Sequence, residues 1–131
     1  MHNLAFGIDC ALAALIWLVQ VIVYPSFRYV DASRFKQWHA EYTRKMGYIV
    51  APLMIVQLSL ALHATISRPA VGQWSGLALV AGTWLSTFAL SVPLHRRLQS
   101  RGKDESAIER LVSTNWIRVV LWTTLALRHV P

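Results

Sequence analysis

Cysteine and acidic side chains are scarce in this chain of 131 residues. Cys10 is the only cysteine, so no disulfide and no cysteine-based metal cluster can form within one chain. The sequence contains no H-E-x-x-H motif, no Glu-x-x-His pair, no Gly-rich phosphate loop and no nucleophile elbow. A carboxylate-bridged metal centre is therefore not expected, and no set of metal ligands is predicted.

Apolar residues, in contrast, make up 55% of the chain, and the mean hydropathy is +0.41. Both values exceed what a soluble domain of this size needs. A bilayer core about 30 Å thick is crossed by roughly 20 helical residues. The sequence offers four such stretches, at residues 4–24, 46–66, 72–94 and 107–128. Residues 1–131 are therefore predicted to form one transmembrane domain, with lipid as the solvent.

Basic residues give the chain a net charge of +7 and a pI near 10.3. They gather in two of the three connections: Arg28, Arg34, Lys36, Arg44 and Lys45 in the first, and Arg96, Arg97, Arg101 and Lys103 in the third. Positive charge identifies the cytoplasmic side, which places both termini outside, in a bacterial inner membrane by our interpretation. Because these charges already serve topology and attraction to anionic lipid, no nucleic-acid partner is predicted.

The connections carry signals of their own. Pro25 is expected to end the first helix, because proline supplies no amide to the helix ladder. Apolar residues at three- and four-residue spacing then predict an amphipathic helix at the inner membrane face, running into the second span, with Ser33 as its N-cap: Phe35, Trp38, Tyr42 and Met46. Gly102 is expected to terminate the third helix, and Ser106 with Glu109 to form a capping box. The predicted fold is an all-α, up-down-up-down four-helix bundle.

Polar residues within the spans follow the helical period, which places them along one face of each helix. These faces are Asp9, Gln20 and Tyr24 in the first span, Pro52, Val56, Ser59 and His63 with Gln57 beside them in the second, Trp84, Thr87, Ser91 and His95 in the third, and Asn115, Arg118 and Trp122 in the fourth. Because polar groups are costly in lipid, the four faces are predicted to share one interior.

Depth divides this interior into two layers, at about 1.5 Å of rise per residue. Asp9 and His63 are predicted in the outer half. The inner half is predicted to contain Gln20, Tyr24, Ser91, His95 and Asn115, with Gln57 and Arg118 nearer the middle. His39 and Tyr42, one helical turn apart, are expected to close the inner layer from below.

Arg118 admits two interpretations. As a structural residue it donates to Gln57, Asn115 or backbone carbonyls and fixes helix packing. As a functional residue it anchors an anionic or carbonyl group of a ligand, because its planar fork of donors suits such a group in low dielectric. The functional interpretation assigns ligand binding to Arg118, Asn115, Gln20, Gln57 and Trp84, and proton handling to His95, Tyr24 and His39. The cofactor stays open among haem, quinone and metal. If a metal or haem is bound, His39 and His95 are its candidate ligands; otherwise water and lipid headgroups satisfy these two side chains.

Four short motifs are similar to a known family: YPSF after the first span, YIVAP in the second, PLHRRL at the end of the third and NWIRVVLW in the fourth. Across nearly its whole length the chain resembles the small four-helix membrane proteins grouped with anthrone oxygenases. The resemblance implies a four-helix membrane bundle and admits an oxygenase acting on a lipophilic aromatic substrate. It assigns no catalytic role to the matching positions, which are Tyr24, Pro25, Pro52, Pro93, Asn115 and Arg118.

Three classes of function therefore stay open. The first is a lipophilic-ligand site in the inner layer, whose sharpest form is a membrane oxidoreductase. The second is an accessory subunit or scaffold of a larger complex or homo-oligomer, favoured by the small-residue spacing of Gly7 with Ala11 and Ala78 with Gly82. The third is a small dimeric transporter using Asp9, although a coupling carboxylate is expected nearer the midplane.

Overall fold

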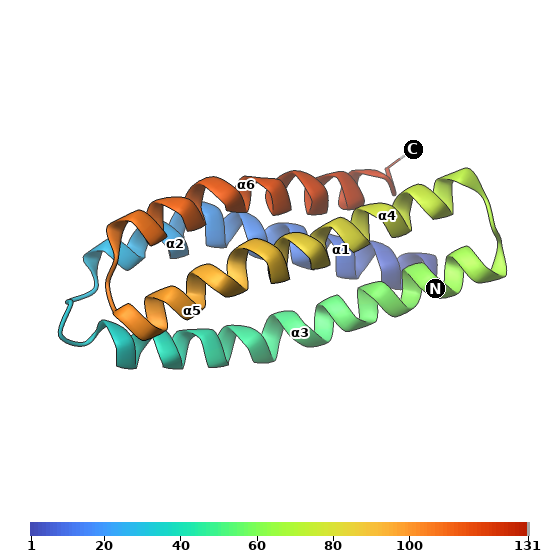
Figure 1. Ribbon diagram of the computed structural model, residues 1–131. Coiled ribbons are helices and arrows are strands. Elements are labelled where there is room, and N and C mark those ends of the chain that lie inside the picture. The colour runs from blue at the N-terminus through green and yellow to red at the C-terminus, as the bar shows by residue number, and fades with distance from the viewer. Residues whose placement is uncertain (131) are drawn as a thin grey trace.

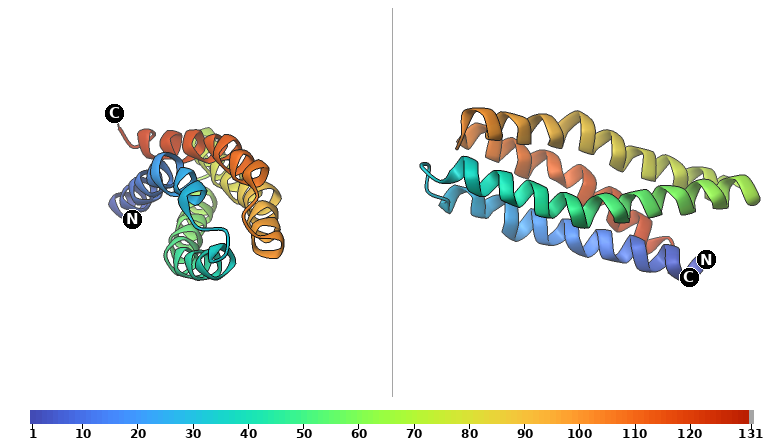
Figure 2. Two further views of the ribbon diagram at one scale, coloured as in Figure 1. Left: turned by 90° about the vertical axis from the view of Figure 1, so that its left-hand side faces the viewer. Right: turned by 90° about the horizontal axis from the view of Figure 1, so that it is seen from below.

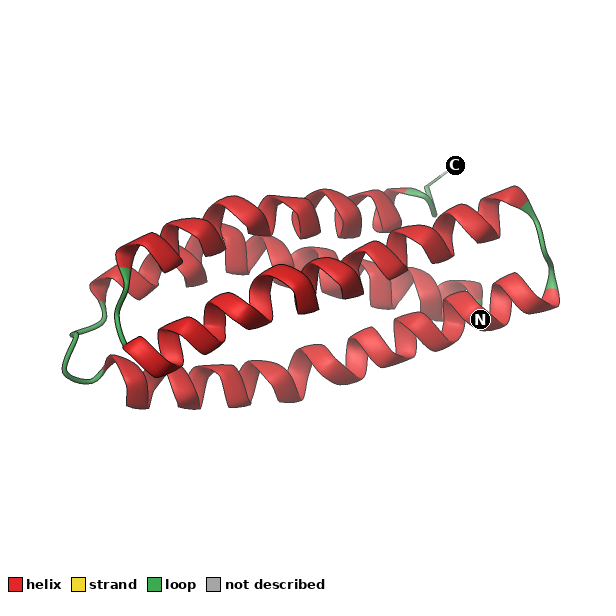
Figure 3. Ribbon diagram, viewed as in Figure 1, coloured by secondary structure: helices red, strands yellow, loops and turns green. Residues whose placement is uncertain are grey.

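Four antiparallel helical rods form the molecule in the computed structural model, which describes residues 1–130 (Figure 1). The first rod consists of α1 (His2–Leu18), η1 (Val19–Val23), α2 (Tyr24–Ser26) and η2 (Phe27–Tyr29), the second of α3 (Phe35–Ser67), the third of α4 (Val71–Ser86), η3 (Thr87–Ser91) and α5 (Val92–Arg101), and the fourth of α6 (Glu105–Leu127). Only short loops join the rods (Figure 3). The predicted all-α, up-down-up-down bundle is confirmed.

The two ends of the bundle differ in charge. Both termini and the connection at residues 68–70 lie at one end, which we call the terminal end (Figure 1). Residues 30–34 and 102–104 lie at the other, which we call the basic end because most of the Lys and Arg residues gather there. The first and third rods each pack against both α3 and α6, which gives a four-membered ring in end view (Figure 2).

Three helices among residues 1–130 are long and apolar enough to cross a membrane: His2–Tyr29, Phe35–Ser67 and Val71–Arg101. The protein is therefore a small helical membrane protein. The fourth rod, α6, is not among the three, and it carries Glu105, Glu109, Arg110 and Arg118. That α6 also crosses the bilayer stays a prediction.

Three prolines lie inside rods without ending them: Pro25, Pro52 and Pro93. Pro25 was expected to terminate the first helix, but the rod continues to Tyr29. A π-turn, η1, precedes this proline, and the Tyr24 amide reaches back to the Val19 carbonyl. The wider turn shifts the carbonyl that the proline ring would otherwise strike. The third rod has the same arrangement of a π-turn before a proline, with η3 immediately before Val92 and Pro93.

Residues 35–45 are helical, as predicted, and form the first turns of α3 without a break. Their aromatic face packs on the fully buried ring of Phe27, which lies 5.1 Å from the Trp38 ring and 5.2 Å from the Tyr42 ring. This segment is thus tied into the bundle as an extension of a span and does not form a separate helix along the membrane face. The helix begins at Phe35 with Arg34 as its N-cap, so the predicted Ser33 cap is wrong. The Ser33 hydroxyl instead donates to Asp31.

The connection between the third and fourth rods has a different cap from the predicted one. Gly102 ends α5 with a positive φ of 90°, as its sequence position indicated. Asp104, and not Ser106, is the N-cap of α6, and its carboxylate accepts the Ala107 amide at 3.2 Å. The Ala107 hydrogen bond and the neighbouring Arg97 guanidinium, 2.8 Å away, lower the pKa of Asp104 below its ordinary value of 3.8.

The predicted inward faces hold for the first and fourth rods but fail for α3. Asp9, Gln20, Tyr24, Asn115, Arg118 and Trp122 are all buried. In α3 the predicted polar face, Pro52, Val56, Ser59 and His63, is exposed, and the buried residues of this part of the helix are Met54, Gln57 and Thr65. The Ser59 hydroxyl donates to the Ile55 carbonyl of its own helix at 2.9 Å. Serine therefore needs no inward partner, and its polarity does not indicate the buried side.

Candidate functional site

Buried polar groups between the first rod, in η1 and α2, and α6 begin a connected hydrogen-bond network. The Asn115 amide nitrogen donates to the Gln20 carbonyl oxygen at 2.8 Å, and the Gln20 nitrogen donates to the Val112 backbone oxygen at 3.1 Å. Nη2 of Arg118 donates to Oδ1 of Asn115 and, at 3.0 Å, to the Tyr24 hydroxyl. The structure therefore brings Gln20, Asn115 and Arg118 together, three of the five residues predicted to bind a ligand.

Tyr24 extends this network toward the basic end. Its hydroxyl lies 3.2 Å from Nε2 of His95, and Nδ1 of His95 lies 2.9 Å from Nε2 of His39. Nδ1 of His39 is 2.8 Å from Oε1 of Gln99. Three different rods supply the tyrosine and the two histidines, so the structure joins all three residues predicted to handle protons. Gln99 was not predicted; its one sequence signal is its place one helical turn after His95.

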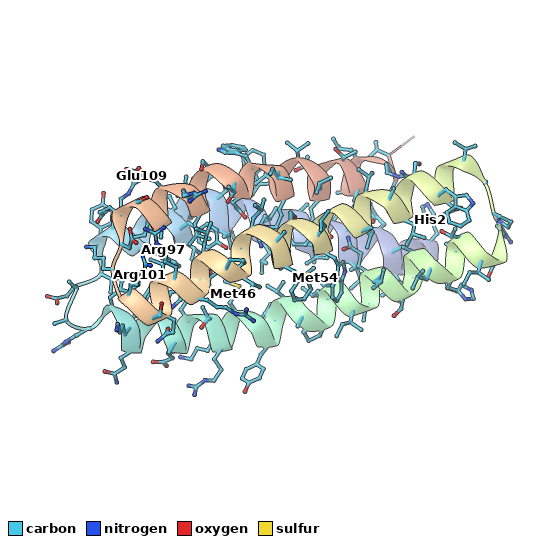
Figure 4. The ribbon with its side chains drawn as sticks, in the orientation of Figure 1. His2, Met46, Met54, Arg97, Arg101 and Glu109 are labelled. Carbon is cyan, nitrogen blue, oxygen red and sulfur yellow. The ribbon has the colours of Figure 1, made fainter. Side chains whose placement is uncertain are left out.

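A cavity of about 390 Å³ adjoins this network. Its polar side is formed by Tyr24, His39, His95 and Arg118. Most of the remaining wall is apolar and includes Leu15, Ile16, Val19, Met46, Val50 and Trp122. The lining also includes the exposed residues Gly47 of α3 and Arg96 of α5, so the cavity reaches the surface between these two helices. Figure 4 labels Met46 on α3, with Arg97 and Arg101 toward the basic end and Met54 and His2 toward the terminal end.

The charge of Arg118 has no carboxylate partner among residues 1–130. The ion pairs of the described chain all involve other residues, and Arg118 is only 7% exposed. Its two side-chain partners, a hydroxyl and an amide oxygen, are neutral, and both contact Nη2. A guanidinium has five N–H donors, so this side chain keeps donors for a further acceptor. An uncompensated cation in low dielectric is costly and favours an anionic or strongly dipolar neighbour.

A second polar cluster lies toward the terminal end. The Gln57 nitrogen donates to Oδ1 of Asp9 at 2.6 Å, and the Trp122 indole donates to the Gln57 oxygen at 3.2 Å. Nε2 of His129 lies 2.8 Å from Oδ2 of Asp9. Gln57 was predicted beside Arg118, but it belongs to this cluster and does not line the cavity. Sequence reasoning missed His129, whose only signal was its place beyond the fourth span, at the same end as Asp9.

Two further expected residues lie apart from the cavity. His63 was placed at the depth of Asp9, but it is exposed and its ring nitrogen lies 3.4 Å from the Ser67 hydroxyl. Trp84, predicted to bind ligand, is half-buried near Phe88, with 5.7 Å between the ring centres, and does not line the cavity. Its indole nitrogen is buried with no hydrogen-bond partner in the described chain.

The donor set of the site is made of neutral nitrogen and oxygen groups with one buried cation, Arg118. Within residues 1–130, no group of three or more His, Cys, Asp and Glu side chains is arranged to hold a metal ion. His39 and His95 instead use ring nitrogens to contact each other. The arrangement is suited to gripping a polar head at Arg118 and exchanging protons with it through Tyr24 and His95. Comparison with models of protein families, with curated proteins and with solved structures gives no match.

Proposed function

We propose that this membrane protein binds an amphiphilic small molecule in the cavity, with its anionic or carbonyl head at Arg118. The observation that carries the proposal is a buried guanidinium without a carboxylate partner, facing an apolar cavity. Bidentate, charge-assisted hydrogen bonds to Arg118 offset the cost of burying this cation. The apolar wall beside it accommodates the body of the ligand, and the opening beside Gly47 lets the ligand enter from the bilayer.

The size and chemistry of the cavity narrow the ligand class. About 390 Å³ lies within the usual range of small-molecule pockets, roughly 300–1,000 Å³. Tyr24 and His95 stand beside Arg118, so a head group that exchanges protons is favoured over a permanently charged one. Phenols, hydroquinones and quinones meet these conditions, and we extend the proposal to a membrane oxidoreductase acting on such a compound. The resemblance to the anthrone oxygenase group is compatible with a lipophilic aromatic substrate.

A second candidate, a scaffold subunit, is favoured by the outer face of α1. A side chain added at Gly7 would meet nothing within 4 Å, and Gly7 and Ala11 are both exposed. Small residues four apart on an exposed face allow another membrane helix to approach closely. The other small pair has a different role, because Gly82 packs against Leu121 within the bundle. The transporter alternative gains no comparable support, since Asp9 is occupied by Gln57 and His129.

Binding of a nitrophenol with a long alkyl chain tests the ligand site. The detergent-solubilised protein is titrated with this probe, and melting temperature is measured alongside. Arg118→Lys is expected to weaken binding at least about tenfold, because an ammonium lacks the planar fork, with little change in melting temperature. Arg110→Lys, an exposed position on the same helix, is the matched control and should bind like the wild type. Unchanged binding with a lowered melting temperature would refute the site and leave Arg118 a packing residue.

A further inference from the structure

The hydrogen bonds at the basic end of the cavity all run from donor to acceptor in the same direction, because the groups at both ends of the series have fixed roles. The Gln99 amide nitrogen donates to the Lys36 carbonyl at 3.2 Å, so the Gln99 oxygen is the acceptor that faces His39. Nδ1 of His39 must then carry the hydrogen. At the opposite end, Arg118 can only donate, and it donates to the Tyr24 oxygen at 3.0 Å.

These fixed ends determine the tautomers between them. A neutral imidazole carries one hydrogen, so Nε2 of His39 accepts from Nδ1 of His95 across 2.9 Å. Nε2 of His95 then accepts from the Tyr24 hydroxyl at 3.2 Å. The donors therefore point in sequence from Tyr24 to His95, from His95 to His39 and from His39 to Gln99.

This chain of hydrogen bonds connects the cavity with the protein surface. Tyr24, His95, His39 and Gln99 all line the cavity, and Gln99, like the neighbouring Lys36, is also exposed at the basic end. His39 is only 1% exposed and lies between His95 and Gln99, which contact its two ring nitrogens. Its ring stacks on Phe35, with 5.6 Å between the ring centres. A buried ring with both nitrogens engaged in a directed chain is placed to pass a proton, since packing alone requires no particular tautomer.

We propose that Tyr24, His95 and His39 form a proton relay that carries a proton from a weakly acidic ligand to water at the basic end. The relay rests on the ligand site proposed above and specifies its chemistry, namely a phenol, hydroquinone or similar O–H acid. The ligand oxygen gives its proton to Oη of Tyr24 as the Tyr24 proton moves to Nε2 of His95. The Nδ1 proton of His95 moves to Nε2 of His39, and the Nδ1 proton of His39 leaves to water beside Gln99.

Each residue of the relay is neutral before and after the transfer, and the ligand is left as an anion beside Arg118. This outcome accounts for a buried cation with no carboxylate of its own, because the charge is balanced only when the ligand ionises. The two histidines end in the opposite tautomers. Proton return along the same path, or reorientation of the rings and the hydroxyl, resets the chain.

A pH jump on the bound nitrophenol tests the relay. Protein loaded with the long-chain nitrophenol at acidic pH is mixed rapidly with alkaline buffer, and absorbance follows phenolate formation. His39→Gln should slow this step at least about tenfold when compared with the wild type at equal occupancy of the probe, since positioned proton-transfer groups contribute about 10²–10⁴-fold in rate. His63→Gln, an exposed histidine on the same helix, should match the wild type.

A tyrosine pair provides a second test that retains ring packing. Tyr24→Phe removes the relay hydroxyl and should also slow proton release, whereas Tyr48→Phe, at an exposed tyrosine of α3 away from the cavity, should not. Slow release in His39→Gln and Tyr24→Phe, with the probe still bound, supports the relay. Equal release rates in all variants would overturn the relay and leave the ligand site standing. Failure of the wild-type protein to bind the probe would overturn both.

Discussion

Asn115→Leu tests most sharply whether the hydrogen bonds of the polar network, which cannot easily be replaced by others, stabilise the fold. We call a network of this kind locked. The Asn115 side chain is 1% exposed, donates to Gln20 and accepts from Arg118. Leucine fills a similar volume but leaves the Gln20 oxygen without its donor and removes one neutral partner of the Arg118 guanidinium. The substitution therefore separates hydrogen bonding from packing.

The expected loss follows from the two bonds removed. An unsatisfied buried group costs about 1–3 kcal/mol, and a hydrogen bond to a charged group contributes about 1.5–3 kcal/mol. Measured hydrogen bonds between membrane helices are weaker, averaging about 0.6 kcal/mol, because freed groups find other partners. Here Gln20 is held by Val112 and Arg118 by Tyr24, so re-pairing is restricted. We expect Asn115→Leu to lower the free energy of unfolding by about 2–4 kcal/mol.

Unfolding in mixed micelles of mild detergent and dodecyl sulfate, followed by circular dichroism, measures this loss. Thr114→Val is the control, because Thr114 is only half-buried and its hydroxyl donates to the Arg110 carbonyl of its own helix. Its free energy of unfolding should stay within about 0.5 kcal/mol of the wild type. A loss below about 1 kcal/mol for Asn115→Leu would refute the locked network, since it would match the average for groups that re-pair freely.

Three further predictions concern the helix cap, the second polar cluster and the orientation. Asp104→Ala should lower the melting temperature at neutral pH. Folding lowers the pKa of the Asp104 carboxyl, so the stabilisation by this cap is present above pH 3.8 and is lost as the pH falls further. If the wild type and Asp104→Ala differed in melting temperature by the same amount in acid as at neutral pH, Asp104 would not be the cap. Asp9→Leu should lower the free energy of unfolding by about 2–4 kcal/mol in the same micelle titration. Asp9→Asn should lower it by less than half of that, because an amide oxygen still accepts a hydrogen bond from Gln57. Equal losses of stability in the two variants would refute a stabilising hydrogen bond between Gln57 and Asp9. With Cys10 replaced by Ala, a cysteine introduced at Pro69 should react with an impermeant thiol reagent in intact cells and one at Ser100 should not; the reverse pattern would invert the orientation.

The sequence by itself determined the positions of the four helices and the gathering of positive charge at one end. Long apolar stretches have no other stable form in a bilayer than a helix. The four predicted stretches coincide with the four rods, although the first and third rods continue to Tyr29 and Arg101, beyond the predicted ends at 24 and 94. The helical period also placed Gln20 and Tyr24 on one buried face and Asn115 and Arg118 on another. These predictions needed only local chain geometry.

The tertiary structure decided which of these faces meet and which polar groups pair. Tyr24, His95 and His39 lie on three different rods, and their contact depends on the rotation of each rod about its own axis, which no single segment encodes. The rotation of α3 places Gln57 against Asp9 and Trp122 and turns Ser59 and His63 outward. A serine or threonine that bonds its own backbone carries no signal of the buried side, so the polar pattern of α3 was ambiguous.

Local exceptions to the helix rules were also settled only by the fold. Pro25 and Pro93 each follow a π-turn, so both rods continue past residues that sequence rules treat as terminators. Asp104 took the cap of α6 because Arg97, from the preceding helix, holds its carboxylate in place. Sequence thus fixed the elements and their polar faces, whereas the pairing across helices arose from packing, because side chains far apart in the chain choose partners only after the rods have assembled.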